Sequence, residues 1–197
     1  MLVDKSVRDL LAAFSSSDPT PGGGSASALA SAVGASLLLM VTALPKTRSN
    51  SDEDRRALDG AATTLTGLRQ QLAEAIDADT RAYDTVVAAY KLPKASDEEQ
   101  RARKTAIQRA LRAATDVPLG VMRLSTEAFE QAAIVAAHGN PNAASDVGVA
   151  RALLQSGATG ARLNVEVNLD GIADPEYREA VRREVETLAS GLSSGLR

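Results

Sequence analysis

The sequence feature that most constrains the fold is the long stretch from Pro19 to Pro45, which contains no ionisable side chain. Ala, Ser, Gly and Leu dominate this stretch, and its pattern predicts a helix over residues 24–44. A helix that is apolar or small on nearly all of its faces needs neighbours all round it. The stretch is therefore expected either at the centre of a helical bundle or across a membrane, since its length also suits a bilayer span.

Three observations favour the centre of a bundle. The stretch carries several hydroxyl groups and is interrupted by Gly34, and the rest of the chain is patterned as amphipathic helices that need an apolar partner. The hydroxyl groups belong to Ser27, Ser31, Ser36 and Thr42. Acidic residues precede the stretch where a signal peptide would carry basic ones. We therefore expect a buried central helix and no association with a membrane.

Composition narrows both the fold and the class of function. Apolar residues make up 44% of the 197 residues but aromatic residues only 3%, which suits closely packed helices better than a sheet. A net charge of −3 argues against nucleic-acid binding, which needs a basic surface. The absence of cysteine excludes disulfides and thiol catalysis, and it is typical of a cytoplasmic protein. The length predicts a single domain over residues 1–197.

Helix start signals recur along the chain. Three pairs have the spacing of a capping box or its acidic equivalent, and two prolines follow good capping residues. The pairs are Ser6 with Asp9, Ser51 with Asp54 and Ser96 with Glu99, and the prolines follow Asn140 and Asp174. The predicted helices span 5–15, 24–44, 51–91, 97–137, 141–156, 158–169 and 175–194. Pro118 is expected to kink or split the fourth, and residues 164–168 alternate like a strand. The predicted fold class is all-α, a single multi-helical bundle with a long central helix.

One carboxylate lies on an otherwise apolar or aromatic stripe of the helix predicted over 51–91. At 100° per residue the stripe contains Leu65, Leu68, Leu72, Ile76, Asp79, Tyr83, Val86 and Tyr90. A buried carboxylate is costly unless it is paired, hydrogen-bonded or protonated. Asp79 is therefore a candidate for proton exchange near neutral pH, and the alternative is that it caps another helix or pairs with a buried Arg. Asp77 lies on nearly the opposite face and forms no dyad with it.

The segment that leads into the helix over 24–44 combines prolines and glycines. Pro19 and Pro21 precede Gly22, Gly23 and Gly24, so few side chains could follow its backbone, and at least one positive φ is expected among the glycines. Because the first N–H groups of a helix lack internal partners, such a loop can bind an anionic or carbonyl-bearing ligand. The alternative is a tight entrance to a buried helix.

Further polar residues are candidates for binding. On a helix over 157–168, Asn164 and Asn168 share a face with small residues, which suits either a ligand with donors and acceptors or a polar helix contact. Asp146 is either a partly buried acid or a first-turn charge favoured by the helix dipole. Lys91 and Lys94 lie at a helix end, where cations are favoured in any case.

Other types of site are not indicated. The single histidine, His138, precedes an expected helix end and is typical of a surface or capping role. One histidine without cysteines argues against a zinc site, so we expect no bound metal. The acidic clusters over 52–54 and 97–99 are interpreted as solvated first turns of helices. Neither a P-loop nor a dinucleotide-binding fingerprint is present.

A series of short motifs resembles the cyclodeaminase domain of formiminotransferase-cyclodeaminase and the related free-standing methenyltetrahydrofolate cyclohydrolases. The matches follow one another along nearly the whole chain, and it is their order that makes the signal strong. They are Pro21 to Ser25, Asp77 to Tyr83, Lys91 to Lys94, Val117 to Leu119, Gly139-Asn140, Ser145-Asp146, Asn164-Val165 and Asn168-Leu169.

This resemblance implies an enzyme of folate one-carbon metabolism. Asp79, the second Asp of the Asp-Ala-Asp motif, would transfer protons, and a tetrahydrofolate derivative would be the substrate, with no bound cofactor. The substrate-binding residues would be Gly22, Gly23, Gly24, Ser25, Tyr83, Lys91, Lys94, Asn140, Asp146, Asn164 and Asn168. A homodimer is also expected, because family members are dimers and the 24–44 helix needs neighbours all round it.

Two reactions fit the resemblance. A cyclodeaminase would close the methenyl bridge of formiminotetrahydrofolate with release of ammonia, and a cyclohydrolase would hydrolyse that bridge to 10-formyltetrahydrofolate. The match around Asp79 favours the deaminase, whereas the lack of a transferase segment in this sequence favours the cyclohydrolase. The expectation leans to the deaminase. An alternative of another class is a non-catalytic dimeric helical protein that binds folate.

Overall fold

The computed structural model describes residues 1–193, and every regular element in this range is a helix. The elements are η1 (Leu2–Asp4), α1 (Val7–Phe14), α2 (Gly23–Thr42), α3 (Asp52–Tyr90), α4 (Asp97–His138), η2 (Pro141–Ala143), α5 (Ala144–Leu169) and α6 (Pro175–Ser193). The predicted all-α class is confirmed. The last residue of the helix predicted over 175–194 lies outside the described residues.

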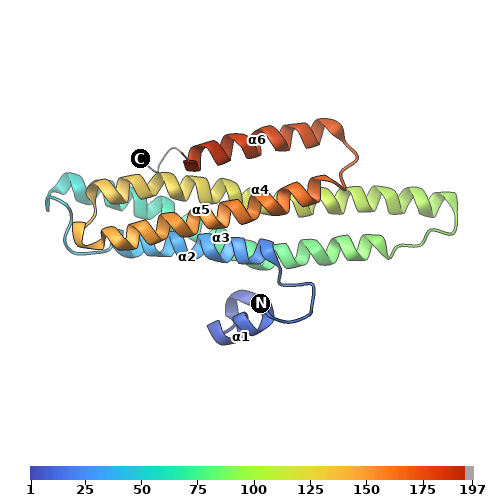
Figure 1. Cartoon of the computed structure of the whole chain (residues 1–197), viewed down its shortest axis with the longest axis horizontal. Coiled ribbons are helices and arrows are strands. Elements are labelled where there is room, and N and C mark those ends of the chain that lie inside the picture. The colour runs from blue at the N-terminus through green and yellow to red at the C-terminus, as the bar shows by residue number, and fades with distance from the viewer. Residues whose placement is uncertain (194–197) are drawn as a thin grey trace.

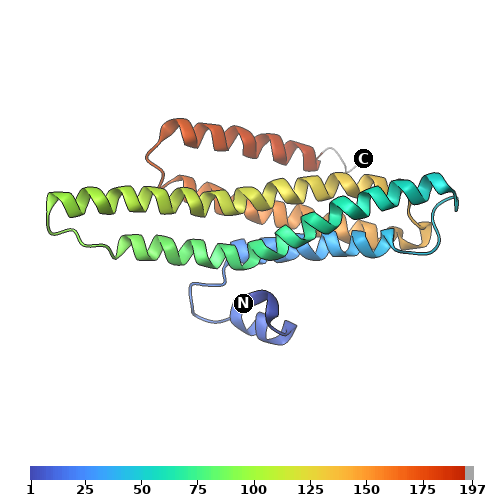
Figure 2. The ribbon, with the colours of Figure 1, turned by 180° about the vertical axis from the view of Figure 1, so that it is seen from behind.

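Helices α2 to α5 form an antiparallel four-helix bundle in chain order (Figure 1). Each of them packs against its neighbours in the sequence, and α5 closes the ring by packing on α2. α3 and α4 are about twice as long as α2, so their hairpin extends beyond the start of α2 (Figure 2). α6 lies outside the bundle against α4 and α5. The bundle therefore has an end at which α2 begins against the middle of α3.

The predicted helix caps are present. The hydroxyl groups of Ser6, Ser51 and Ser96 each accept a hydrogen bond from the backbone N–H three residues later, and Ser96 forms a complete capping box with Glu99. The side-chain oxygen of Asn140 caps η2 by accepting a hydrogen bond from the Asn142 N–H, two residues later. Each cap satisfies one of the N–H groups that a helix leaves free at its start. The sequence therefore located the helix starts closely.

α4 runs without a break through Pro118, so the expectation that this residue splits the helix is wrong. A proline inside a helix removes one N–H, which leaves the carbonyl four residues earlier without its usual donor. Here that carbonyl belongs to Ala114, and the Asn168 side chain donates to it from α5 at 2.8 Å. A neighbouring helix thus replaces the hydrogen bond that Pro118 cannot supply.

α5 is one continuous helix. The expected break near residue 157 is therefore absent, and residues 164–168 are helical although their sequence alternates like a strand. Gly157 lies against α2, and a Cβ at this position would overlap Ser31 Oγ and approach the Ser27 carbonyl oxygen to 2.7 Å. Close packing on α2 therefore requires a glycine here, although glycine weakens a helix on its own. Val165 lies within the 164–168 segment and is fully buried, so that segment is helical with one face in the core.

α2 is the central apolar helix that the sequence predicted. Its length and mean hydropathy of 1.7 would also suit a membrane span, but 56% of that window is buried within the protein. Ala28, Ala35 and Leu38 are fully buried and face the other helices of the bundle. The remaining face of α2 stays exposed, with Val33 and Met40 each more than 40% accessible. The helix thus has neighbours on most of its faces but not on all of them.

The N-terminal segment is held to α3 by Asp77. This side chain is 7% exposed and accepts hydrogen bonds from the backbone N–H groups of Leu2, at 2.6 Å, and of Val3, at 3.4 Å. α1 follows and contributes no buried residue, and it lies to one side of the bundle (Figure 1). Asp77 therefore has a structural role on a different face of α3 from Asp79.

Candidate functional site

A cavity of about 330 Å³ lies where α2 begins against α3, α4 and α5. Its wall brings together segments from four parts of the sequence. The lining residues are Pro19, Thr20, Gly22, Gly23, Gly24, Asp79, Ala82, Tyr83, Val86, Leu111, Ala114, Asn164 and Asn168. Seven of the residues that the sequence marked for the site are in this wall, three of them from the Gly22–Gly24 segment.

Asp79 enters the cavity wall from α3 and also binds the start of α2. Its Oδ2 atom accepts hydrogen bonds from Ser25 N, at 2.8 Å, and from Ser25 Oγ, at 3.0 Å. The N-cap residue of α2 is Gly22, which has no side chain for this task, and Ser25 is the third residue of the helix. Asp79 therefore supplies the missing cap from another helix. Within residues 1–193, its Oδ1 atom makes no hydrogen bond to the protein.

Asp79 is half-buried, so the expectation that it lies inside the apolar core is wrong. The apolar stripe is buried up to Ile76, which is 3% exposed, but Tyr83 on the same stripe is 42% exposed. The reason is the length of α2, which begins at Gly23 and leaves the later part of α3 without that partner. Asp79 stands at the transition, where the core gives way to the cavity.

Gly24 allows the Asp79 carboxylate to approach α2. A Cβ built on Gly24 would overlap both carboxylate oxygens of Asp79, whereas a Cβ on Gly23 would only touch the Asn164 amide at 3.4 Å. No glycine of the described chain has a positive φ, and Gly22 is extended, so the expected left-handed residue is not found. The glycine is needed here for close approach rather than for an unusual backbone angle.

Asn164 and Asn168 lie one turn apart on α5 and face the cavity together. Asn164 donates through Nδ2 to the Gly160 carbonyl oxygen, and Asn168 donates through Nδ2 to that of Ala114, both at 2.8 Å. Because a carbonyl oxygen only accepts, these bonds fix which end of each amide is the nitrogen. Both amides therefore have a fixed orientation, and their Oδ1 atoms remain as acceptors.

The electrostatics of the cavity are simple. Among its described lining residues, Asp79 and Tyr83 are the ones that can ionise, and α2 carries no charged side chain. The free N–H groups at the start of α2 place partial positive charge beside Asp79, which stabilises its negative charge. The arrangement offers one carboxylate oxygen, two amide oxygens and a phenol to a ligand that carries hydrogen-bond donors.

Ser25 belongs to the Asp79 site but not to the cavity wall. It is fully buried behind the carboxylate, and its hydroxyl lies 2.8 Å from the Ile76 carbonyl oxygen as well as 3.0 Å from Asp79 Oδ2. A bound substrate would not reach this side chain without displacing Asp79. Its place in the site is therefore behind Asp79, although the sequence grouped it with the substrate-binding residues.

Besides Ser25, four of the expected binding residues do not line this cavity. Lys91 is exposed at the end of α3, and Lys94 lines a separate cavity at the α3–α4 tip together with Arg103 and Lys104. Asn140 and Asp146 lie at the opposite end of the bundle. Between Ala114 and the end of α4 the helix axis covers roughly 35 Å. Within one chain, these two residues are too far from Asp79 to contact the same small ligand.

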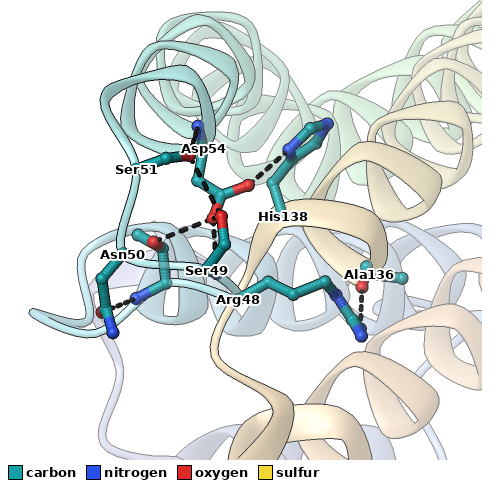
Figure 3. Close-up of polar contacts among 8 residues, drawn as sticks. Arg48, Ser49, Asn50, Ser51, Asp54, Ala136 and His138 are labelled. Carbon is teal, nitrogen blue, oxygen red and sulfur yellow. Dashed lines mark hydrogen bonds and ion pairs between the residues drawn. The ribbon is translucent and has the colours of Figure 1, made fainter.

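A second polar cluster forms at that opposite end around Asp54 (Figure 3). Asp54 Oδ2 accepts hydrogen bonds from the Ser49 N–H and hydroxyl groups, at 2.7 and 2.6 Å, and from Thr47 Oγ1 at 3.1 Å. Its Oδ1 lies 2.9 Å from His138 Nδ1 at the end of α4. These contacts, led by the Ser49 hydroxyl, hold the pKa of Asp54 well below its ordinary value.

The Asp54 cluster fastens the α2–α3 loop to the end of α4. Arg48 adds to it through its backbone N–H, which donates to the His138 carbonyl oxygen, and through its side chain, which donates to the Ala136 carbonyl oxygen (Figure 3). The interpretation of residues 52–54 as a solvated turn is wrong for Asp54, which is 6% exposed. The Ser51 cap signal was correct, but sequence spacing could not show that His138 meets this turn. Within the described residues, no group of three or more acidic or histidine side chains is placed to hold a metal ion.

Comparison with known proteins agrees with this architecture. The sequence matches the formiminotransferase-cyclodeaminase family over residues 6–187. It is 41% identical to the methenyltetrahydrofolate cyclohydrolase of Methylorubrum extorquens, over 95% of this chain and 90% of that protein. It is 32% identical to the formimidoyltransferase-cyclodeaminase of Rattus norvegicus, of which it spans 35%.

The fold also matches a crystal structure of formiminotetrahydrofolate cyclodeaminase from Thermotoga maritima. The TM-score is 0.87 at 24% sequence identity, and the match covers 98% of this chain and 93% of the other. The family match, which spans nearly the whole chain, and the identity to the bacterial relative lead to the same assignment. The chain belongs to the formiminotransferase-cyclodeaminase family.

Proposed function

We propose that the cavity at the start of α2 binds a tetrahydrofolate derivative and that the chain acts on the carbon that joins N5 and N10. The observation that carries this proposal is the hydrogen bonding of Asp79 in the cavity wall. Its Oδ2 accepts hydrogen bonds from Ser25, whereas its Oδ1 has no donor within the described residues. The oxygens of Asn164 and Asn168 suit the N–H groups of a pterin ring. Membership of the family supports the same substrate class.

Hydrolysis of the methenyl bridge is the first reaction we assign. Water adds to the cationic methenyl carbon and gives one proton to Asp79, which leaves a neutral carbon that carries OH and two nitrogens. Asp79 then gives that proton to N5, the bond between this carbon and N5 breaks, the hydroxyl proton leaves to solvent, and 10-formyltetrahydrofolate is formed. One carboxyl group performs both proton transfers. The steps balance with water alone, so the proposed mechanism uses no further cofactor.

The cyclodeaminase reaction is the second candidate. N10 attacks the carbon of the protonated formimino group and passes its proton to Asp79, which returns it to the amino nitrogen. The carbon–nitrogen bond breaks, ammonia leaves and the methenyl bridge remains. The several formimidoyltransferase-cyclodeaminase relatives favour this reaction. The sequence motif around Asp79 favours it as well. The higher identity to a cyclohydrolase, 41% against 32%, supports hydrolysis as the first candidate.

Separate assays with the two substrates test the proposal. The purified protein is incubated with 5,10-methenyltetrahydrofolate and, separately, with 5-formiminotetrahydrofolate, while the absorbance of the methenyl group is followed. Hydrolysis lowers this absorbance faster than the buffer control, and cyclodeamination raises it. If folate binds but neither reaction is accelerated, the protein is a folate-binding protein and the proposed catalysis is wrong.

We further propose that the basic groups at the α3–α4 tip bind the glutamate carboxylates of the folate. Lys94, Arg103 and Lys104 line a cavity there together with Ile107. Ile107 is one helical turn from Leu111 of the first cavity, so a tail could pass from one cavity to the other. Replacing Lys94 and Lys104 by Ala should raise KM for a folate with several glutamates more than for the monoglutamate. Equal KM changes for both would contradict this tail site.

A homodimer that buries the exposed face of α2 is also proposed, in a cytoplasmic protein. Val33 and Met40 on this face are 43% and 41% exposed, and no charged residue interrupts it from Pro19 to Pro45. Light scattering should give twice the monomer mass, and Val33→Asp should give the monomer. Val167→Asp is the matched control, because Val167 is 72% exposed on α5. A monomeric wild type at micromolar concentration would contradict the proposal.

A further inference from the structure

The hydroxyl group of Ser25 faces two acceptors with one proton. Ser25 Oγ is 2.8 Å from the Ile76 carbonyl oxygen and 3.0 Å from Asp79 Oδ2, while the Ser25 N–H already donates to the same Oδ2 at 2.8 Å. A hydroxyl hydrogen rotates freely about the C–O bond, but it serves one strong acceptor at a time. Asp79 Oδ2 therefore has one fixed donor and one donor that can turn away from it.

The direction of this hydroxyl follows from the charge on Asp79. An ionised carboxylate is the stronger acceptor, since hydrogen bonds to charged groups are about twice as strong as neutral ones. Once the carboxyl group carries a proton on Oδ1, Oδ2 is a weaker acceptor, and the Ile76 carbonyl competes for the hydroxyl. Ser25 is fully buried, so water cannot replace either bond.

We propose that Ser25 is the positioning residue for proton transfer by Asp79, an inference that rests on the proposed function of Asp79. Its hydroxyl donates to Oδ2 while Asp79 is ionised and turns to the Ile76 carbonyl when Asp79 is protonated. The carboxyl group is thus hydrogen-bonded in both protonation states, and proton exchange is confined to Oδ1, the oxygen that accepts no hydrogen bond within the described residues. Ser25 touches no substrate and acts through Asp79.

The surroundings contain few other groups that could produce the same pH response. Among the described residues of the cavity wall, the other ionisable group is Tyr83 from α3. α2 has no charged residue, α4 contributes Leu111 and Ala114, and α5 contributes two amides. Asp77 faces the N-terminal segment. A pH effect of changing Ser25 would therefore report on Asp79.

The test compares Ser25→Ala with Ser27→Ala. Ser27 lies in the same first turns of α2 and is 6% exposed, but its hydroxyl donates to the Gly23 carbonyl oxygen and not to Asp79. In Ser25→Ala we expect kcat to fall about tenfold with KM changed less than twofold, because the hydrogen bond to the charged form is lost. The acid limb of the kcat/KM profile should move upward by about one pH unit. Ser27→Ala should keep the wild-type profile.

A second measurement does not depend on turnover. The carboxyl ¹³C resonance of Asp79, assigned by its absence in Asp79→Asn, is followed against pH in the wild type and both serine variants. Its midpoint should move upward in Ser25→Ala only. If the wild type is inactive but the midpoint moves, the proposed function is wrong while the coupling of Ser25 to Asp79 holds. An unchanged midpoint and pH profile in folded Ser25→Ala would overturn the inference.

Discussion

Asp54 lies in the first turn of α3 and Asp79 caps the start of α2 from the middle of α3, so the two carboxylates stand at opposite ends of one bundle, and their hydrogen bonding differs. Both oxygens of Asp54 are bonded, to Ser49, Thr47 and His138, and the side chain is 6% exposed. Asp79 lines a cavity and is held through one oxygen by Ser25, and its other oxygen accepts no hydrogen bond within the described residues. A carboxylate with every acceptor site filled stabilises the fold. One with a free acceptor at a cavity can also exchange a proton with a ligand.

The largest expected effect comes from Asp79→Asn. The amide keeps the shape and can still accept from Ser25, but it cannot exchange the proton, so turnover should fall by roughly 10²–10⁴. Folate binding should change far less. The free energy of unfolding should fall by about 1 kcal/mol at most, because charge is lost at the start of α2.

The matched control for that variant is Asp54→Asn, which should keep turnover per folded molecule. Turnover and thermal melting are measured for both proteins under the same conditions. Near-normal turnover in Asp79→Asn together with a large loss of stability would contradict the proposed difference between the two carboxylates. Asp79 would then stabilise the fold, as Asp54 does, and would not transfer protons.

Gly24→Ala should have the next largest effect on turnover. The new Cβ would overlap the Asp79 carboxylate, so the side chain must move, and a displacement of about 1 Å can lower the rate roughly 10²-fold. Gly23→Ala is the control, since its Cβ would meet only the Asn164 amide at 3.4 Å. Steady-state kinetics of the two variants test this, and equal rates would show that the approach of Asp79 to α2 does not matter for activity.

Asp54→Ala should affect stability rather than catalysis. It leaves Ser49, Thr47 and His138 without their common acceptor and removes one of the links between the α2–α3 loop and α4. We expect the melting temperature to fall by roughly 5 °C or more, with kcat of the folded fraction unchanged. Calorimetry and kinetics at a temperature well below the transition decide this. A selective loss of kcat would assign the cluster a functional role.

The smallest expected effect is the loss of the stabilisation by Asp54 at acidic pH. The pKa of Asp54 is lowered in the folded protein, so its contribution is fully present above its unfolded pKa of about 3.9 and is lost as pH falls further. The stability difference between the wild type and Asp54→Asn should therefore narrow between pH 7 and about pH 3. Urea unfolding at these two pH values measures it. If the stability difference between the wild type and Asp54→Asn were larger at the lower pH, the folded state would not stabilise the ionised form of Asp54.

The helices and the core of the site were predictable because their signals are local. Ser51 and Ser96 mark helix starts through their own hydroxyl groups, and Asp79 stands out on its stripe by spacing alone. Gly22 to Gly24 also belong to the cavity, although the reason at Gly24 is contact with Asp79 and not a positive φ. Helix periodicity is enough to find such features.

What the sequence could not show depends on contacts between distant segments. The continuity of α4 through Pro118 needs Asn168 from α5, and the buried state of Asp54 needs His138 from the end of α4. The half-burial of Asp79 depends on where α2 starts relative to α3. The distance of Asn140 and Asp146 from the Asp79 cavity within one chain was hidden for the same reason, because motif order along the chain carries no distances.

The hydrogen bond from Asn168 to Ala114 has a consequence for how this family can vary. Pro118→Ala would restore an N–H to α4, and that N–H would compete with Asn168 for the Ala114 carbonyl. The asparagine amide would then be free to turn toward the cavity, so a change that improves the helix would alter the binding site. Conversely, losing Asn168 is costly while Pro118 is present and mild once it is gone. The two positions are therefore expected to be replaced together, and the effect of either substitution depends on the other.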